Sequence, residues 1–101
     1  HYNGNMDNIR FTWGTRKALE NQRNHGISFE EATTVFADEN ARLKHDPDHP
    51  QGEDRFIFIG FSSKLRLLVV VHAYRQADNE IRIISARKAT KTEREQYGGF
   101  L

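Results

Sequence analysis

The 101-residue sequence contains no cysteine, only two prolines and a single tryptophan. The absence of cysteine excludes a disulfide scaffold and any zinc site built from thiolates. No apolar run approaches the ~20 residues that a transmembrane helix requires. The first residues show no basic stretch followed by an apolar one, so we expect a cytoplasmic protein without a signal peptide. A chain of this length is expected to form one domain.

The sequence also lacks a large excess of either charge, because 15 Lys and Arg residues nearly balance 14 Asp and Glu residues and leave a net charge of +1. This total argues against a nucleic-acid-binding protein. The distribution argues the other way, since residues 28–54 carry eight acidic and two basic side chains and residues 55–91 carry eight basic and two acidic ones. The second segment therefore predicts a positive face. The alternative is that the two segments neutralise each other where they pack together.

Hydrophobic periodicity and capping signals predict an α+β fold. A polar helix is expected at residues 15–25, ended by Gly26. A second helix begins at Ser28, because Ser28 and Glu31 match a capping box. A short helix is capped by Thr90, with Glu93 at its third position. Alternation predicts strands at residues 9–13, 41–45, 55–62, 65–74 and 80–86.

The last three strands follow one another through short polar turns, which predicts an antiparallel meander. We expect a compact single domain in which the two N-terminal helices pack on one face of the sheet. The domain is expected at residues 6–97, with an added or disordered lead-in at residues 1–5 and a tail at residues 98–101.

Strand alternation divides the strand at residues 65–74 into two faces. The odd-numbered positions are all apolar, so we expect them to pack on the helices. Arg66, His72 and Tyr74 then lie on the opposite face. An imidazole that titrates near neutrality, a guanidinium that matches phosphate oxygens and a tyrosine that stacks on bases together suit RNA cleavage without a metal. The alternative is an ordinary surface strand with a satisfied histidine.

Two further segments carry side chains that could bind an anion or a metal ion. Arg87, Lys88 and Lys91 lie between a strand end and a helix start, where backbone N–H groups attract anions; a solvated connection is the alternative. The segment from His45 to His49 holds imidazole and carboxylate groups, but its spacing matches no closed zinc pattern. We therefore predict no metal site and no cofactor.

Several motifs together resemble the BrnT-type toxins of bacterial BrnT/BrnA toxin–antitoxin pairs. They are the segment Phe11–Thr12–Trp13, the run HGISFEEA at residues 25–32, Glu53–Asp54–Arg55, and the run IRIISARKAT at residues 81–90 followed by Glu93, Arg94 and Tyr97. The resemblance implies a RelE-like fold and a ribonuclease that inhibits translation. It also implies a BrnA-like antitoxin with a ribbon-helix-helix part, which neutralises the toxin and binds operator DNA.

The resemblance covers Arg55, Arg82, Arg87 and Lys88, and face alternation adds the remaining candidates. The predicted catalytic residues are Arg66, His72, Tyr74 and Arg87. The predicted RNA-binding residues are Arg55, Lys64, Arg75, Arg82, Lys88 and Lys91. Alternation places Arg82 and Arg87 on opposite faces unless a bulge or the strand end intervenes. A non-catalytic RNA-binding or adaptor module remains the alternative function.

Overall fold

The computed structural model describes residues 8–46 and 54–98 of the chain. The expected lead-in at residues 1–5 lies outside the described residues, as do residues 99–101 of the expected tail. Residues 47–53, which include His49 and Glu53, lie outside them as well. Among the described helices, none is long and apolar enough to cross a membrane.

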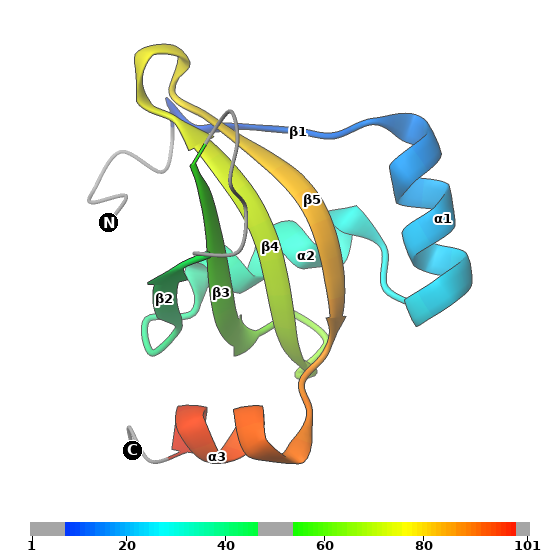
Figure 1. The fold of residues 1–101 in the computed structure, drawn as a ribbon, viewed down its shortest axis with the longest axis vertical. Helices are drawn as coiled ribbons and strands as arrows, with labels where there is room; N and C mark the ends of the chain where they lie inside the picture. Colours follow the sequence, from blue (N-terminus) through cyan, green and yellow to red (C-terminus); the bar gives the residue numbers. More distant parts are fainter. Residues whose placement is uncertain (1–7, 47–53, 99–101) are drawn as a thin grey trace.

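In the described part of the chain a mixed five-stranded sheet organises the fold, with its strands in the order β1-β5-β4-β3-β2 (Figure 1). The strands are β1 (Arg10–Thr12), β2 (Arg42–His45), β3 (Arg55–Phe61), β4 (Leu67–Arg75) and β5 (Glu80–Lys88). The strands β2 to β5 pair in chain order and antiparallel, so the predicted meander is confirmed. The exception is β1, which pairs with β5 in parallel.

Gly26 and Ser28 set helix ends as the sequence predicts, whereas the Glu31 side chain does not complete the predicted capping box and α1 (Thr15–His25) begins after Gly14 without a side-chain cap. Helix α1 ends at Gly26, whose φ of 72° is the left-handed conformation that glycine adopts without strain. Helix α2 (Phe29–Thr33) begins after Ser28, whose hydroxyl accepts a 3.0 Å hydrogen bond from the backbone N–H of Glu31. A 3₁₀ helix, η2 (Thr34–Ala37), continues α2.

The C-terminal helix α3 (Lys91–Gly98) begins with a complete capping box. The backbone N–H of Thr90 donates to Glu93 Oε1 at 2.8 Å, and the backbone N–H of Glu93 donates to Thr90 Oγ1 at 3.2 Å. Another 3₁₀ turn, η3 (Gln76–Asp78), joins β4 to β5. The short polar turn that the sequence predicts between the last two strands is therefore confirmed.

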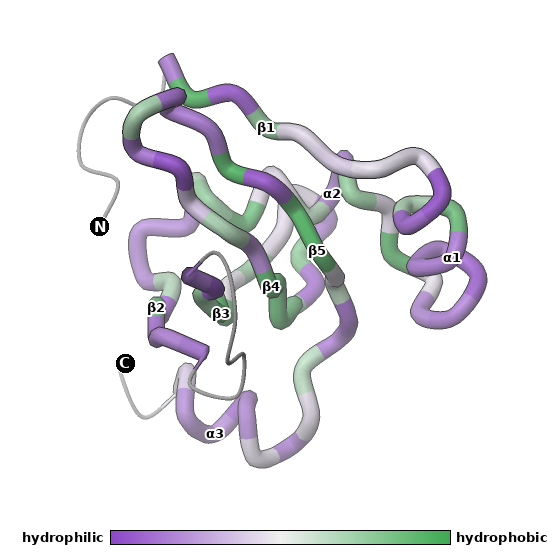
Figure 2. The backbone as a smooth tube through the Cα atoms, turned by 45° about the horizontal axis from the view of Figure 1, so that its top comes forward, coloured by the Kyte–Doolittle hydropathy of each residue, from purple (hydrophilic) through white to green (hydrophobic). Residues whose placement is uncertain are grey.

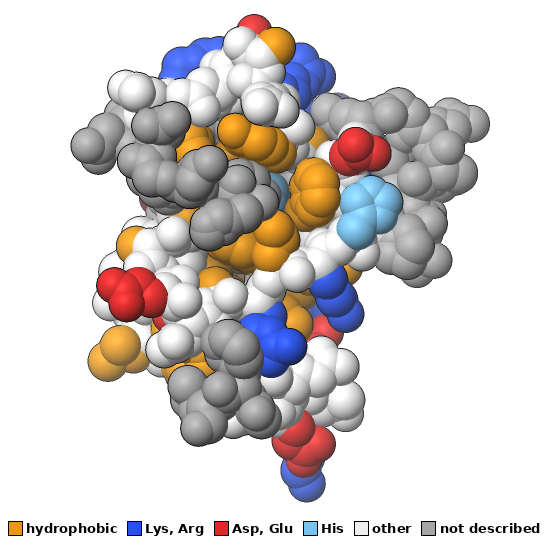
Figure 3. Space-filling view, turned by 90° about the vertical axis from the view of Figure 1, so that its left-hand side faces the viewer, with side chains coloured by type: hydrophobic (Ala, Val, Ile, Leu, Met, Phe, Trp, Pro, Cys, Tyr) orange, Lys and Arg blue, Asp and Glu red, His pale blue; other side chains and the backbone are white. Residues whose placement is uncertain are grey.

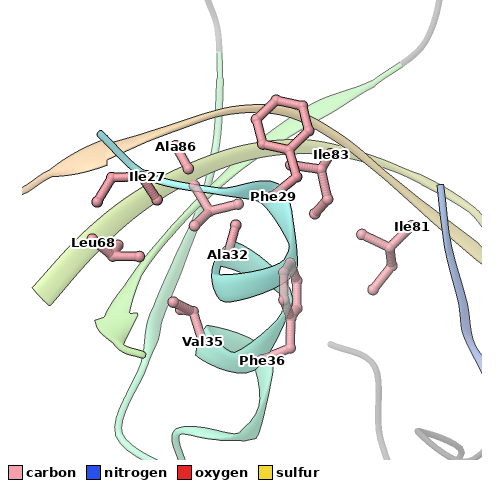
Figure 4. Packing of buried hydrophobic residues seen from close by; sticks show 10 residues of the cluster. Ile27, Phe29, Ala32, Val35, Phe36, Leu68, Ile81, Ile83 and Ala86 are labelled. Carbon is pink, nitrogen blue, oxygen red and sulfur yellow. The ribbon is translucent and has the colours of Figure 1, made fainter. Parts of the chain in front are cut away.

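The main hydrophobic core lies between α2 with η2 and one side of the sheet, here called the core face. Figure 4 shows Phe29, Ala32 and Val35 turned toward Leu68 and Ile83 of the sheet, and all five are fully buried. Helix α1 lies beside β5, and its Ala18 contacts the same core. Figure 2 shows that α1 is mostly hydrophilic, which fits its peripheral position, whereas β4 carries a long hydrophobic stretch.

A buried polar side chain fastens α1 to the sheet. Asn21 Nδ2 donates to the carbonyl oxygens of Ile27 at 2.9 Å and Ala86 at 2.8 Å, and Asn21 Oδ1 accepts from the backbone N–H of Ala86 at 3.1 Å. Strand β1 pairs with β5 only as far as Arg82, so it does not reach the backbone groups of Ala86. The Asn21 side chain provides the hydrogen bonds to these groups in place of a neighbouring strand.

The opposite side of the sheet, here called the open face, is covered by α3 over one end only. There Tyr97 packs against Ile59, Leu67 and Val69 in a second, smaller core. The Tyr97 hydroxyl donates to Asp38 Oδ2 at 2.8 Å, which ties α3 to the end of η2. Because both faces of β4 meet apolar partners, both of its side-chain sets are mostly apolar.

The predicted assignment of the two faces of β4 is wrong. The even-numbered residues Leu68, Val70 and His72 lie on the core face, and the odd-numbered Val69 and Val71 lie on the open face. Alternation shows that two faces exist, but it does not show which one α2 covers. Leu65, expected at the start of the core side of this strand, lies before β4 in a turn and is 81% exposed.

Candidate functional site on the open face of the sheet

A β-bulge brings two arginines of β5 to the same face. Val71 pairs with Ser85 but the next residue, His72, pairs with Ile83, so Ile84 is an extra residue in β5. Such an insertion reverses the alternation of the side chains that follow it. Arg82 consequently lies opposite Ala73, and Arg87 lies opposite Val69, both on the open face. The sequence pattern placed these two arginines on opposite faces unless a bulge or the strand end intervened, and a bulge does intervene.

A row of cross-strand neighbours sets Arg55 and Arg82 on either side of Ala73. Arg55 of β3 pairs with Ala73 of β4, which in turn pairs with Arg82 of β5. Neighbouring strands are ~4.8 Å apart, so the two arginine backbones are separated by roughly 10 Å. Arg55 Nε is buried without a hydrogen-bond partner among the described residues. Buried N–H groups of this kind normally find an acceptor.

The floor between these arginines is apolar and its borders are basic. Ile57 and Val71 form the next row, which ends at Lys44 of β2. The following row ends at Arg42, and Arg75 lies beyond Arg82 at the other end of the face. The face therefore carries basic side chains from four strands. They are Arg42, Lys44, Arg55, Arg75, Arg82 and Arg87.

Acidic groups on this face have partners of their own. Glu80 accepts a 2.6 Å hydrogen bond from Thr12 Oγ1 and lies 3.8 Å from Arg10 Nη2. Glu93 of α3 accepts from both Nη atoms of Arg87 at 2.8 Å. The hydrogen bonds from Arg87 lower the pKa of Glu93 to about 2. Arg87 is thus held in one orientation at the end of the face that α3 covers.

Arg66, a predicted catalytic residue, lies in the turn between β3 and β4 rather than on the open face. Its guanidinium pairs with Glu31 of α2 through two hydrogen bonds, of which the one from Nε measures 2.9 Å. Ser62 Oγ donates to the same carboxylate at 2.7 Å. Hydrogen bonding to Arg66 lowers the pKa of Glu31. This pair fastens the turn to α2.

His72, a second predicted catalytic residue, is fully buried on the core face. Its ring contacts Phe36, Phe56 and Phe58, with centroid separations of 4.8, 6.0 and 5.5 Å. Burial lowers the pKa of His72 to about 4, so the imidazole is neutral at physiological pH. It is therefore placed as a core residue, out of reach of a substrate on the open face.

The other predicted residues divide between the faces and the strand ends. Tyr74 packs against the core cluster, opposite Ile81, and leaves the open face. Lys64 is exposed in the β3–β4 turn, and Lys91 is exposed at the first turn of α3. Lys88 ends β5 opposite Leu68, a core-face position. Of the predicted site, the structure brings together Arg55, Arg75, Arg82 and Arg87.

Two basic residues of this face were missed as site candidates. Arg42 and Lys44 lie on the edge strand β2 and pair with open-face residues of β3. The sequence signal was available, because a strand at residues 41–45 places these two positions on the same side. Within residues 8–46 and 54–98, no group of three or more His, Asp or Glu side chains is arranged to hold a metal ion.

The fold and the basic open face define a small α+β domain of a known architecture. The crystal structure, at 1.1 Å resolution, of the ribonuclease toxin BrnT from Brucella abortus superposes with a TM-score of 0.62. The sequence identity is 21%, and the match covers 82% of this chain and 99% of that one. This likeness shows the fold.

Sequence comparison gives the family. Residues 13–93 match the family described as the ribonuclease toxin BrnT of type II toxin–antitoxin systems, so the chain belongs to the BrnT family. The resemblance seen in the sequence motifs is therefore confirmed, and membership implies an antitoxin partner. No match was found among curated proteins.

Proposed function

We propose that this protein is an endoribonuclease that binds RNA on the open face of its sheet and cleaves it without a metal. The observation that carries the proposal is the row in which Arg55 and Arg82 flank Ala73, with Arg87 on the same face. Family membership supports ribonuclease activity. By inhibiting translation in the cytoplasm, such an enzyme acts as a toxin that its antitoxin neutralises.

The arginines supply what phosphoryl chemistry without a metal requires. In such a reaction the 2′-oxygen of RNA loses its proton and attacks the adjacent phosphorus, and the 5′-oxygen leaves with a proton. Negative charge accumulates on the phosphoryl oxygens in the transition state. Guanidinium groups match those oxygens in geometry and stay protonated throughout, so fixed arginines stabilise this charge. Arg55 and Arg82 approach the floor from both sides.

One acidic and one phenolic side chain near the site, Glu93 and Tyr97, have structural rather than catalytic roles. Glu93 is unsuited to be the general base, because its pKa of about 2 and its bonds to Arg87 make it a poor proton acceptor. Tyr97 is unsuited to be the general acid, because burial, together with its hydrogen bond to Asp38, raises its pKa to about 12. Proton transfer therefore falls to other groups that face the bound RNA.

The apolar floor favours a single strand over a duplex. Ile57 and Val71 are partly exposed between the basic borders. Unpaired bases can pack their rings against such a surface, whereas in a duplex stacking and base pairing already cover the rings and edges of the bases. The partner antitoxin is expected to carry a ribbon-helix-helix part, so that contact with operator DNA belongs to the antitoxin rather than to this chain.

The test is a cleavage assay with purified protein and a labelled single-stranded RNA. We expect cleavage to persist in EDTA and to stop when the nucleotide before the cut lacks its 2′-hydroxyl. Arg82→Ala is expected to lower kcat/KM about 100-fold, the order found for loss of one donor to a transition-state oxyanion. Arg23→Ala is the matched control, since Arg23 is exposed on α1 away from this face.

Each outcome decides between the enzyme and its alternative. Loss of cleavage in EDTA would contradict the metal-free chemistry. If the protein binds RNA and its 2′-deoxy analogue equally well and cleaves neither, the non-catalytic RNA-binding module is favoured. Equal rates for Arg82→Ala and Arg23→Ala would place the site elsewhere on the molecule.

A further inference from the structure

The edge strand β2 has backbone groups that no described strand pairs with. It is the last strand of the sheet, and all four of its residues are exposed. The backbone N–H of Asp46 donates to the carbonyl of Arg55 at 2.9 Å, which makes these two residues a hydrogen-bonded pair. Such pairs alternate along an antiparallel ladder. The N–H and C=O groups of Leu43 and His45 therefore point outward, away from β3.

A pocket of about 240 Å³ adjoins this edge. It lies between β2 and α3 and is lined by Arg42, Leu43, Lys44, Ile59 and Gln96. Arg42 Nη1 donates to the carbonyl of Gln96 at 3.2 Å and so joins β2 to α3 beside the pocket. A strand that adds to a sheet edge gains affinity from main-chain hydrogen bonds and specificity from pockets for alternate side chains. Both elements are present here.

Charge selects the occupant of the edge. Figure 3, viewed from the β2 side, shows Lys and Arg side chains beside a group of exposed hydrophobic ones. If β2 paired with a second copy of itself around a two-fold axis at Leu43 or Lys44, bases would lie opposite bases: Arg42 against Lys44, or Lys44 against Lys44. Short, charged edge strands protect proteins against such self-pairing. An acidic strand meets no such repulsion at Arg42 and Lys44, so its carboxylates belong at that end of β2 and not at the other end, where Asp54 lies 3.8 Å from His45.

We propose that an extended acidic segment of the antitoxin binds along β2 as a sixth, antiparallel or parallel, strand of the sheet. Its backbone bonds to the outward groups of Leu43 and His45. Its carboxylates lie beside Arg42 and Lys44, and one of its side chains enters the adjoining pocket. The inference rests on the proposed partnership with an antitoxin and specifies where that partner binds.

A backbone-directed variant separates strand addition from other modes of binding. Leu43→Pro removes an outward N–H and leaves the hydrogen bonds between β2 and β3 intact, since proline is tolerated on an edge strand at such a position. Leu43→Ala removes the same side chain but keeps the N–H. In titrations of the full-length toxin with the antitoxin encoded beside it, we expect Leu43→Pro to bind at least 10-fold more weakly than Leu43→Ala.

A charge-directed variant tests the acidic partner. Lys44→Glu is expected to weaken antitoxin binding at least 10-fold, whereas Lys17→Glu, the same change on the exposed side of α1, is expected to have less than a threefold effect. Hydrogen exchange on the unaltered complex adds a readout that needs no variant. The amides of Leu43 and His45 should become protected when the antitoxin binds.

The outcomes distinguish this inference from the proposed function. If the antitoxin fails to bind the unaltered toxin, both the partnership and the docking site are overturned. If it binds but Leu43→Pro equals Leu43→Ala and the two amides stay unprotected, the docking site alone is wrong. If Lys44→Glu impairs RNA cleavage but leaves antitoxin binding unchanged, the edge is a nucleic-acid contact and the inference is overturned.

Discussion

Replacing Asn21 by alanine tests the contact that holds α1 against the sheet. The side chain is 6% exposed and makes three hydrogen bonds, to Ile27 and to both backbone groups of Ala86. Ile27 and Ala86 are fully buried, so water has little access to replace the lost bonds. Each lost bond to a buried partner costs about 1 kcal/mol, which gives roughly 3 kcal/mol in total.

Helix propensity offsets part of this cost. Alanine is favoured over asparagine in a helix by about 0.6 kcal/mol, so the expected net loss for Asn21→Ala is about 2.5 kcal/mol. Asn24→Ala on the exposed side of the same helix gains the propensity without losing buried bonds. Asn21→Asp should be worse than Asn21→Ala, because its carboxylate faces the carbonyl oxygens of Ile27 and Ala86.

Urea unfolding followed by circular dichroism measures these differences. With a slope of about 1.5 kcal/mol per M, the midpoint for Asn21→Ala should fall by roughly 1.5–2 M. Its melting temperature should fall by about 10–20 °C. If the free energy of unfolding of Asn21→Ala lies within about 0.5 kcal/mol of that of Asn24→Ala, the bonds to Ala86 do not hold α1 against the sheet.

Three further predictions concern pH and backbone strain. The Arg87–Glu93 pair lowers the pKa of Glu93 to about 2, so its stabilisation is complete above pH 4.5 and is lost as the pH falls toward 2; Glu93→Gln should flatten this dependence in unfolding measurements. Burial lowers the pKa of His72 from 6.5 to about 4, so the unfolded chain binds this proton first and stability declines between pH 6.5 and 4. An NMR titration that protonates the folded His72 imidazole above pH 6 would contradict this. Leu65 has a φ of 60° and is 81% exposed, so Leu65→Gly should stabilise the fold by about 0.5–1 kcal/mol in thermal melts, while Lys64→Gly should not.

Local signals in the sequence predicted most of the fold. Gly26, Ser28 and the pair Thr90–Glu93 mark helix ends through hydrogen bonds between near neighbours, which is why they are visible in the sequence. One member of a predicted capping box departs from the pattern. Glu31 turns its carboxylate to Arg66 and Ser62, residues distant in the sequence, so no local rule shows this contact.

The candidate site was predicted less well, for two physical reasons. Because β4 carries apolar residues on both sides, its sequence does not show which face α2 covers. His72 and Tyr74 were therefore predicted on the open face but lie on the core face. The bulge at Ile84 changes the alternation within β5, and it depends on pairing with β4 rather than on Ile84 itself. Arg55 and Arg82 were selected through the family motif, which is independent of both effects.

If the proposed function is right, RNA contacts the arginines of the open face. The most direct measurement follows the Nε–H signals of arginine side chains by NMR while an uncleavable 2′-deoxy-substituted RNA is added. We expect the signals of Arg55, Arg82 and Arg87 to shift in a saturable manner, while those of Arg16 and Arg23 on α1 do not. Shifts confined to Arg16 and Arg23, with Arg55 and Arg82 unchanged, would contradict it.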